Sequence, residues 1–187
     1  MRPRLLILLT LSLLAYSAQG PTPVNIAIET SLGTIKLELD SAKAPASVAN
    51  FVQYAKAGHY DGSVFHRVIK GFMIQGGGYD EAYAQRPTRA PIQNEAKNGL
   101  KNARGSIAMA RTGDPHSATA QFFINHKDND FLDYPGQDGW GYCVFGKVTD
   151  GMDVVDAIAA TPTGPAPPFG RDVPIKPVVI KKVTVTE

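Results

Sequence analysis

Apolar and polar residues alternate with a period of two in three parts of the chain. Residues 24–30 and 34–40 show this pattern on either side of the short turn 31–33. Such alternation is typical of strands with one buried face, so these two segments predict an antiparallel hairpin. Residues 178–185 predict a closing strand. The residues that share one face of this strand are Val179, Lys181, Val183 and Val185.

Two other segments repeat apolar residues every three or four positions, which is the spacing of an amphipathic helix. Residues 44–58 have this spacing, with Pro45 suited to the first turn and Gly58 to the stop. Residues 151–160 predict a second helix. Its apolar face would consist of Met152, Val155 and Ile158.

The centre of the chain holds short apolar pieces separated by Gly, Asn, Asp and Pro. They are residues 64–69, 72–74, 107–110, 122–124 and 142–148. Many short strands with long turns between them favour a closed or sandwiched β architecture. We therefore expect a mainly β fold, one antiparallel barrel of roughly eight strands capped by two α-helices. Residues 161–168 contain four prolines and a glycine and predict an extended surface loop.

Residues 1–20 have the three parts of a secretory signal peptide. Arg2 and Arg4 precede an apolar run over residues 5–14, and small residues follow. A membrane-spanning helix would need about 20 apolar residues, and this run is roughly half as long. We expect cleavage between about residues 17 and 20, which leaves residues 21–187 as a single exported domain. That domain would be periplasmic or secreted, without stable membrane association.

The charge balance argues against one class of partner, and the cysteine content indicates a buried residue. The formal net charge is +2, and removal of the two arginines of the signal peptide leaves 17 basic and 17 acidic residues. Nucleic-acid binding needs an excess of Lys and Arg, so we expect this protein not to bind nucleic acid. The single cysteine, Cys143, lies in an apolar run and is expected to be a small buried residue.

Motifs for other chemistries are missing from the sequence. The four histidines are isolated, and zinc sites need at least three clustered ligands. Neither a dinucleotide-binding motif, a phosphate-binding loop nor a GxSxG motif occurs. We therefore expect no metal and no cofactor.

Polar residues within an apolar segment are the first positive sign of a site. Residues 64–77 include Arg67 and Gln75 among mostly apolar neighbours. In an extended strand Arg67 shares a face with Phe65 and Ile69, where desolvation of its charge is costly. Either a structural carboxylate pairs with this arginine or a ligand meets it, and local sequence leaves both possibilities open.

The sequence Phe-His-Arg-Val-Ile-Lys-Gly-Phe-Met-Ile-Gln-Gly-Gly at residues 65–77 resembles the core signature of the cyclophilin family of peptidyl-prolyl cis-trans isomerases. Four further blocks follow in the family's order, at residues 106–110, 117–124, 131–133 and 144–148. Together with the signal peptide, the pattern is most similar to exported bacterial members. The resemblance implies a closed eight-stranded antiparallel barrel with two helices. It also implies a monomer that isomerises X–Pro bonds of proline-containing polypeptides and assists the folding of exported proteins.

The resemblance also implies roles for individual residues. Arg67 would donate a hydrogen bond to the prolyl nitrogen, with Phe72 and Gln75 as further catalytic residues. The residues expected to bind the substrate are Met73, Ala110, Arg111, Gln121, Phe123, Phe131, Leu132 and Tyr142. For the apolar positions the alternative is ordinary barrel core, which is the stronger interpretation for Phe65, Phe122 and Phe145.

Three positions depart from the pattern of many eukaryotic relatives. Phe131 stands in place of Trp, Arg111 in place of Asn and Tyr142 in place of His. Without the indole N–H donor at position 131, we expect at most weak binding of cyclosporin. Trp140, in the lengthened loop 134–141, is an alternative donor.

Two other functions compete with isomerisation. The first is a chaperone module that binds proline-containing peptides and turns them over only incidentally. The intact Arg67 argues against it, because an apolar pocket alone would supply binding. The second is a hydrolase using Ser and His, for which no nucleophile motif is present.

Overall fold

The two opening strands form the predicted hairpin in the computed structural model, which describes residues 22–186. Strand β1 (Val24–Thr30) pairs antiparallel with β2 (Gly33–Leu39), and Ile35, Leu37 and Leu39 of β2 are fully buried. The signal peptide expected at residues 1–20 lies outside the described residues.

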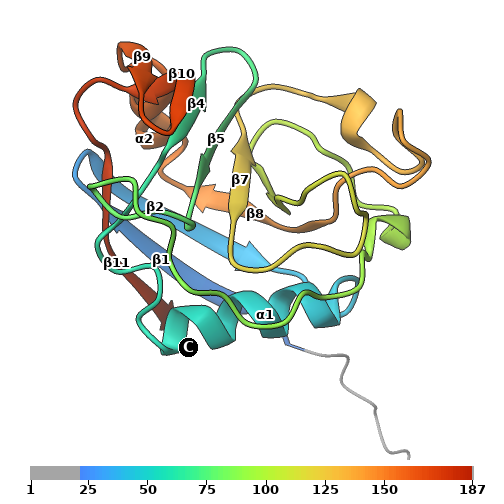
Figure 1. The fold of residues 1–187 in the computed structure, drawn as a ribbon. Helices are drawn as coiled ribbons and strands as arrows, with labels where there is room; N and C mark the ends of the chain where they lie inside the picture. The colour runs from blue at the N-terminus through green and yellow to red at the C-terminus, as the bar shows by residue number, and fades with distance from the viewer. Residues whose placement is uncertain (1–21, 187) are drawn as a thin grey trace, which may run out of the picture.

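Nine strands form one antiparallel sheet that curls around the core (Figure 1). Its order is β3-β11-β1-β2-β8-β6-β7-β5-β4. Besides β1 and β2, these strands are β3 (Ser63–Val64), β4 (Arg67–Ile69), β5 (Met73–Gly76), β6 (Ser106–Met109), β7 (Phe122–Asn125), β8 (Val144–Asp150) and β11 (Val179–Thr186).

The expected closed barrel is present only in part. The edge strands are β3 and β4, and no backbone ladder pairs them within residues 22–186. The chain passes from one edge to the other through Phe65 and His66, so the single predicted strand over residues 64–69 is two short strands. The result is a curled half-barrel of nine strands that closes only in part, where the prediction was a closed barrel of eight.

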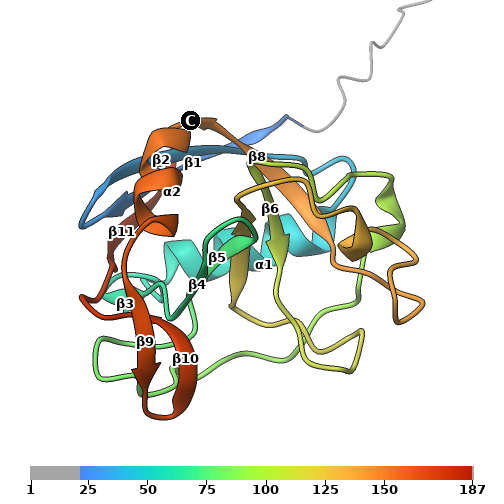
Figure 2. The ribbon, with the colours of Figure 1, turned by 90° about the horizontal axis from the view of Figure 1, so that it is seen from above.

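Both predicted helices are confirmed. Helix α1 (Pro45–Lys56) has a proline in its first turn, and α2 (Met152–Ala159) buries Val155 and Ile158. They lie at opposite ends of the curled sheet, α1 against β11 and α2 against β2, β4 and β5 (Figure 1 and Figure 2). Two short 3-10 helices, η1 (Ala96–Asn98) and η2 (Asp130–Leu132), lie in the long connections.

The proline-rich segment is a hairpin and not the expected surface loop. Strands β9 (Thr163–Ala166) and β10 (Phe169–Pro174) pair with each other, and β10 contacts β4. Both strands of a two-stranded ribbon are edge strands, where a proline without an N–H donor is tolerated. The prolines therefore did not prevent strand formation here.

The face assigned to the last strand is also corrected. Thr30 pairs with Ile180 whereas Glu29 pairs with Lys182, so Lys181 is an extra residue at a β-bulge. A bulge shifts the alternation of side chains by one residue. Ile180 is therefore buried on the same face as Val183, and Val179 lies off it.

Side chains pack into two apolar clusters. The main cluster fills the inside of the curled sheet and includes Phe65, Phe122 and Phe145, as the core interpretation predicted. The second cluster is smaller. It contains Met73, Ala108, Ala110, Phe123, Leu132 and Val144. Among residues 22–186, no helix is both long and apolar enough to cross a membrane.

Candidate active site

The register of three neighbouring strands places a polar pair beside the second apolar cluster. Arg67 of β4 is opposite Gln75 of β5, and Gln75 is opposite Phe123 of β7. Because side chains alternate along a strand, the neighbours Ile74 and Ile124 point into the main core instead. The sheet therefore presents Arg67, Gln75 and Phe123 on its outer face.

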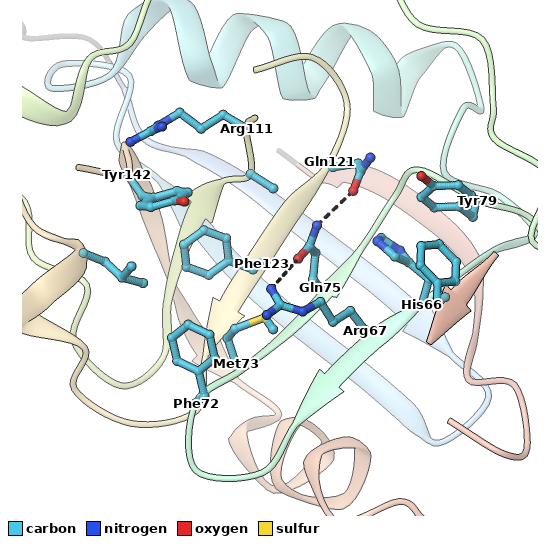
Figure 3. A pocket seen from close by; sticks show the side chains of 13 residues that line it. His66, Arg67, Phe72, Met73, Gln75, Tyr79, Arg111, Gln121, Phe123 and Tyr142 are labelled. Atoms are coloured by element: carbon cyan, nitrogen blue, oxygen red, sulfur yellow. Dashed lines mark hydrogen bonds between the residues drawn. The ribbon is translucent and has the colours of Figure 1, made fainter. Parts of the chain in front are cut away.

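This outer face is hollowed into a cavity of about 300 Å³ (Figure 3). Ten of the eleven side chains predicted from the sequence to act in the site line it. They are Arg67, Phe72, Met73, Gln75, Ala110, Arg111, Gln121, Phe123, Leu132 and Tyr142. Residues that are up to 75 positions apart in the sequence are thus brought to one opening.

Arg67 is half-buried at this opening and is only loosely held. Its Nη1 donates to Oε1 of Gln75 at 3.5 Å, and Nε2 of Gln75 donates to Oε1 of Gln121 at 2.9 Å (Figure 3). No carboxylate within residues 22–186 forms an ion pair with Arg67, so a structural carboxylate does not explain its position. Of five guanidinium N–H donors, most are available to a ligand.

Close approach of the backbone explains the glycine run after Gln75. A Cβ at Gly78 would lie 2.6 Å from the side chain of Gln121, and one at Gly77 would lie 2.8 Å from the ring of Tyr60. Gly77 also has a φ of +86°, which favours glycine. Gly78 therefore makes room for Gln121, which is hydrogen-bonded to Gln75, and Gly77 makes room for the Tyr60 ring.

A buried network of amides holds the apolar end of the cavity. Asn129 donates to the backbone carbonyl of Phe72 at 2.9 Å and to Oδ1 of Asn125 at 2.6 Å. Asn125 donates in turn to Oδ1 of Asn102 at 3.2 Å, and Asn102 donates to Asp133. Sequence reasoning missed this network, because isolated Asn residues give no local signal of burial. It fixes the segments on which Phe72 and Leu132 lie.

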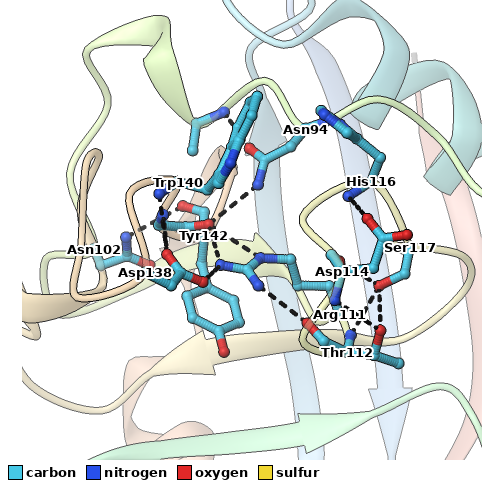
Figure 4. Close-up of polar contacts among 12 residues, drawn as sticks. Asn94, Asn102, Arg111, Thr112, Asp114, His116, Ser117, Asp138, Trp140 and Tyr142 are labelled. Carbon is cyan, nitrogen blue, oxygen red and sulfur yellow. Dashed lines mark hydrogen bonds and ion pairs between the residues drawn. The ribbon is translucent and has the colours of Figure 1, made fainter.

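Arg111 lines the cavity but is engaged in a structural network (Figure 4). Its side chain is only 3% exposed and forms an ion pair with Asp138. Nη2 and Nε of Arg111 donate to the carbonyl of Gly141 at 2.9 and 3.1 Å, and the guanidinium lies 4.3 Å from the ring centroid of Tyr142. Arg111 therefore holds the loop 134–141 and the Tyr142 ring, and its charged end is not free for a substrate.

Phe131 is the one predicted site residue that does not line the cavity. In η2 consecutive side chains diverge by a third of a turn, so Leu132 faces the cavity while Phe131 faces outward and is 47% exposed. It stacks on Phe72 with a centroid distance of 5.7 Å. Trp140, the alternative donor, packs edge-on against His116 and does not line the cavity either.

Three residues at the other end of the cavity were not predicted. His66, Tyr79 and Phe169 line it together. Burial lowers the pKa of His66 from 6.5 to about 4, so its imidazole is uncharged at neutral pH. Phe169 directly follows the segment 161–168 that was expected to be a loop. Its approach to β4 depends on the β9–β10 hairpin, which local sequence does not reveal.

Other reactive groups lie elsewhere. His126 accepts a hydrogen bond from the Gly71 N–H through Nδ1, its Nε2 lies 3.2 Å from Asp156, and it does not line the cavity. Cys143 is buried as predicted, and burial raises the pKa of its thiol to about 11. Within residues 22–186, no three His, Cys, Asp or Glu residues gather in a way that could hold a metal ion.

Known proteins are similar to this chain in sequence and fold. The chain matches the family described as "Cyclophilin type peptidyl-prolyl cis-trans isomerase/CLD" over residues 25–185. It is 56% identical over 163 residues to peptidyl-prolyl cis-trans isomerase cyp18 of Streptomyces antibioticus, covering 86% of this chain and 98% of that one. It is 54% identical over 164 residues to peptidyl-prolyl cis-trans isomerase B of Escherichia coli strain K12, covering 87% and 99%.

A solved structure extends the likeness to three dimensions. A cyclophilin type peptidyl-prolyl cis-trans isomerase of Cryptosporidium parvum superposes with a TM-score of 0.71 at 27% identity, covering 88% of this chain and 98% of that chain. The chain therefore belongs to the cyclophilin family, and it is a peptidyl-prolyl cis-trans isomerase. The resemblance noted in the sequence is confirmed at this level.

The buried imidazole yields a prediction about acid stability. The unfolded chain binds a proton at His66 below pH 6.5, whereas the folded chain binds it only near pH 4. The folded state therefore loses stability relative to the unfolded state as pH falls between these values. The shift corresponds to about 3 kcal/mol of unfolding free energy at full effect. Between pH 7.5 and pH 4.5, the free energy of unfolding of a His66→Phe variant should fall by about 2 to 3 kcal/mol less than that of the unmodified protein. Both values are measured by urea denaturation.

Each protein is compared with itself at the two pH values. A difference in stability between the variant and the unmodified protein at pH 7.5 therefore cancels. His59, whose pKa burial also lowers, and the carboxylates titrate alike in both proteins. Equal losses in the two proteins would show that His66 is protonated without cost in the folded state.

Proposed function

We propose that Arg67 catalyses rotation about the X–Pro bond by donating a hydrogen bond to the prolyl nitrogen. The peptide bond resists rotation because the nitrogen lone pair is delocalised into the carbonyl, with a barrier of about 18–20 kcal/mol. In the twisted state the lone pair is localised and accepts a hydrogen bond far better than in the planar state. A donor placed beside it stabilises the transition state more than the ground state.

One observation carries this proposal. The Arg67 guanidinium lies at the cavity beside its apolar end with no carboxylate partner among the described residues, and its one side-chain hydrogen bond there is 3.5 Å long. A charged donor that protein groups leave nearly unsatisfied is available for a reacting atom. Low polarity around it strengthens the interaction.

The apolar end of the cavity would hold the proline ring. Phe72, Met73, Phe123 and Leu132 line it, and none of them carries a hydrogen-bonding side chain that would retain water. Gln75 and Gln121, joined at 2.9 Å, would bind the peptide backbone on one side of the bond while the other side turns. Nothing in this scheme requires a covalent intermediate, a metal or a cofactor.

We further propose that the substrates are exported polypeptides. The support is the pattern of residues 1–20, with two arginines, an apolar run and a small-residue end. An isomerase exported in this way would act on proline bonds of proteins that fold outside the cytoplasm. Uncatalysed X–Pro isomerisation takes tens to hundreds of seconds, long enough to delay such folding.

Substitution of the arginine tests the mechanism. Arg67→Ala should lower kcat/KM for a capped Ala-Pro peptide by about 100- to 1000-fold, the usual effect of removing one transition-state donor. Arg67→Lys should restore little, because an ammonium lacks the planar fork of donors. Turnover is measured by NMR exchange spectroscopy, and circular dichroism checks that each variant is folded.

Arg171→Ala is the matched control. Arg171 is 86% exposed on the hairpin and does not line the cavity, so its removal should leave turnover unchanged. Near-normal turnover by Arg67→Ala would refute the role of Arg67. Tight peptide binding without turnover by the unmodified protein would favour the chaperone alternative.

The pH dependence separates this mechanism from acid–base catalysis. An arginine stays charged and His66 stays uncharged from about pH 6 to pH 9, so kcat/KM should be nearly constant over this range. The peptide is capped at both ends so that it carries no titrating group. A bell-shaped profile would instead indicate proton transfer by a histidine.

The export proposal predicts the mature N-terminus. The protein isolated from its native cell should begin between about residues 18 and 21, as measured by intact mass spectrometry, and should be found outside the cytoplasmic fraction. An intact N-terminus in a cytoplasmic fraction would contradict export and would leave the isomerase mechanism unaffected.

A further inference from the structure

Three aromatic rings form a wall at the end of the cavity opposite the proposed proline site. Ring centroids lie 4.6 Å apart between His66 and Tyr79, 4.9 Å between Tyr79 and Phe169, and 5.4 Å between His66 and Phe169. Tyr83 adds an edge contact to Phe169 at 6.0 Å. Three separate segments therefore supply one aromatic surface.

A polar strip separates this wall from the proposed proline site (Figure 3). Arg67, Gln75 and Gln121 lie between the rings of His66 and Tyr79 on one side and those of Phe72 and Phe123 on the other. The cavity thus has two apolar ends with the proposed reacting bond between them. A peptide with its proline ring at one end would extend a neighbouring residue toward the other.

Two of the three rings of the aromatic wall are not needed to fill the interior. His66 is buried, but Tyr79 and Phe169 belong to neither apolar cluster. Tyr79 and Phe169 are half-buried, and Phe169 reaches the cavity only because the β9–β10 hairpin lies against β4. An aromatic residue delivered by a separate hairpin to the opening of a cavity is placed to contact a ligand.

The chemistry of this end favours an uncharged, ring-bearing side chain. His66 is an uncharged ring at neutral pH, and no Asp or Glu of residues 22–186 lines the cavity. Tyr79 and Phe169 meet at 85°, so the wall offers both ring edges and ring faces. Aromatic rings interact through edge-to-face and offset contacts that aliphatic side chains lack.

We propose that His66, Tyr79 and Phe169 form a second subsite that binds an aromatic side chain one or two residues from the substrate proline. This inference rests on the proposed function, because it takes Arg67 as the position of the prolyl bond. Phe169 would then be a specificity-determining residue that acts on peptide selection and not on the rotation itself.

The test uses the capped peptide Ala-Ala-Pro-Ala-Ala and four derivatives that each carry phenylalanine in place of one alanine. Dissociation constants are measured by NMR titration for the unmodified protein, Phe169→Ala and Phe169→Leu. At least one derivative should bind the unmodified protein about three- to tenfold more tightly than the parent peptide, the range that an aromatic pair contributes. Both variants should reduce this ratio to near one, and Phe169→Leu keeps apolar bulk on the hairpin if alanine disturbs it.

Ile175→Ala is the matched control, because Ile175 directly follows β10, is 72% exposed and does not line the cavity. This variant should keep the full preference. The subsite is refuted if no derivative binds more tightly than the parent, or if the preference survives in both Phe169 variants. Turnover of the parent peptide is measured separately: normal turnover without an aromatic preference would reject only the subsite, whereas absent turnover would reject the proposed function.

Discussion

The backbone ladder through β4, β5 and β7 fixes both the core and the site. Val68, Ile74 and Ile124 lie side by side on its inner face, where they pack into the main apolar cluster. A slip of one residue would turn these side chains outward and bury the polar ones, so the register is strongly determined. The same register sets Arg67 beside Gln75. The free energy that holds the core together therefore also positions the guanidinium.

The segments at the apolar end of the cavity are held in place by buried hydrogen bonds and not by a strand register. The amides of Asn102, Asn125 and Asn129 are buried, and each finds a partner that an apolar side chain would not need. Burial opposes the charge of Asp133, but hydrogen bonds from Asn102 and Lys101 more than compensate and lower its pKa. Only Oδ1 of Asn129 lacks a hydrogen-bond partner among the buried side-chain atoms of these three residues. A buried polar network of this kind specifies one arrangement of loops. It can keep Phe72 and Leu132 in place without a regular strand beneath them.

How far the sequence predicted the structure depended on how local each signal was. Period-two and helical patterns located the opening hairpin and both helices, because burial on one face acts within a few residues. Ten of the eleven residues that the family motif assigned to the site line one cavity. The bulge at Lys181 was missed, since an inserted residue looks like continued alternation. Phe169 was missed because the proline content of its segment concealed a hairpin whose position depends on tertiary contacts with β4.

Arg67 and Arg111 both line the cavity, but their neighbouring side chains give them different roles. Hydrogen bonds from the backbone N–H of Gly141 and from Arg111 lower the pKa of Asp138 to about 2, so this carboxylate stays ionised and neutralises Arg111. Arg111 in turn stacks on Tyr142, whose ring meets Phe123 edge-on at 5.7 Å. One arginine thus stiffens the pocket wall at no net charge. The positive potential inside the cavity then comes from Arg67 alone among the lining residues, at the point where the proposed mechanism needs a donor.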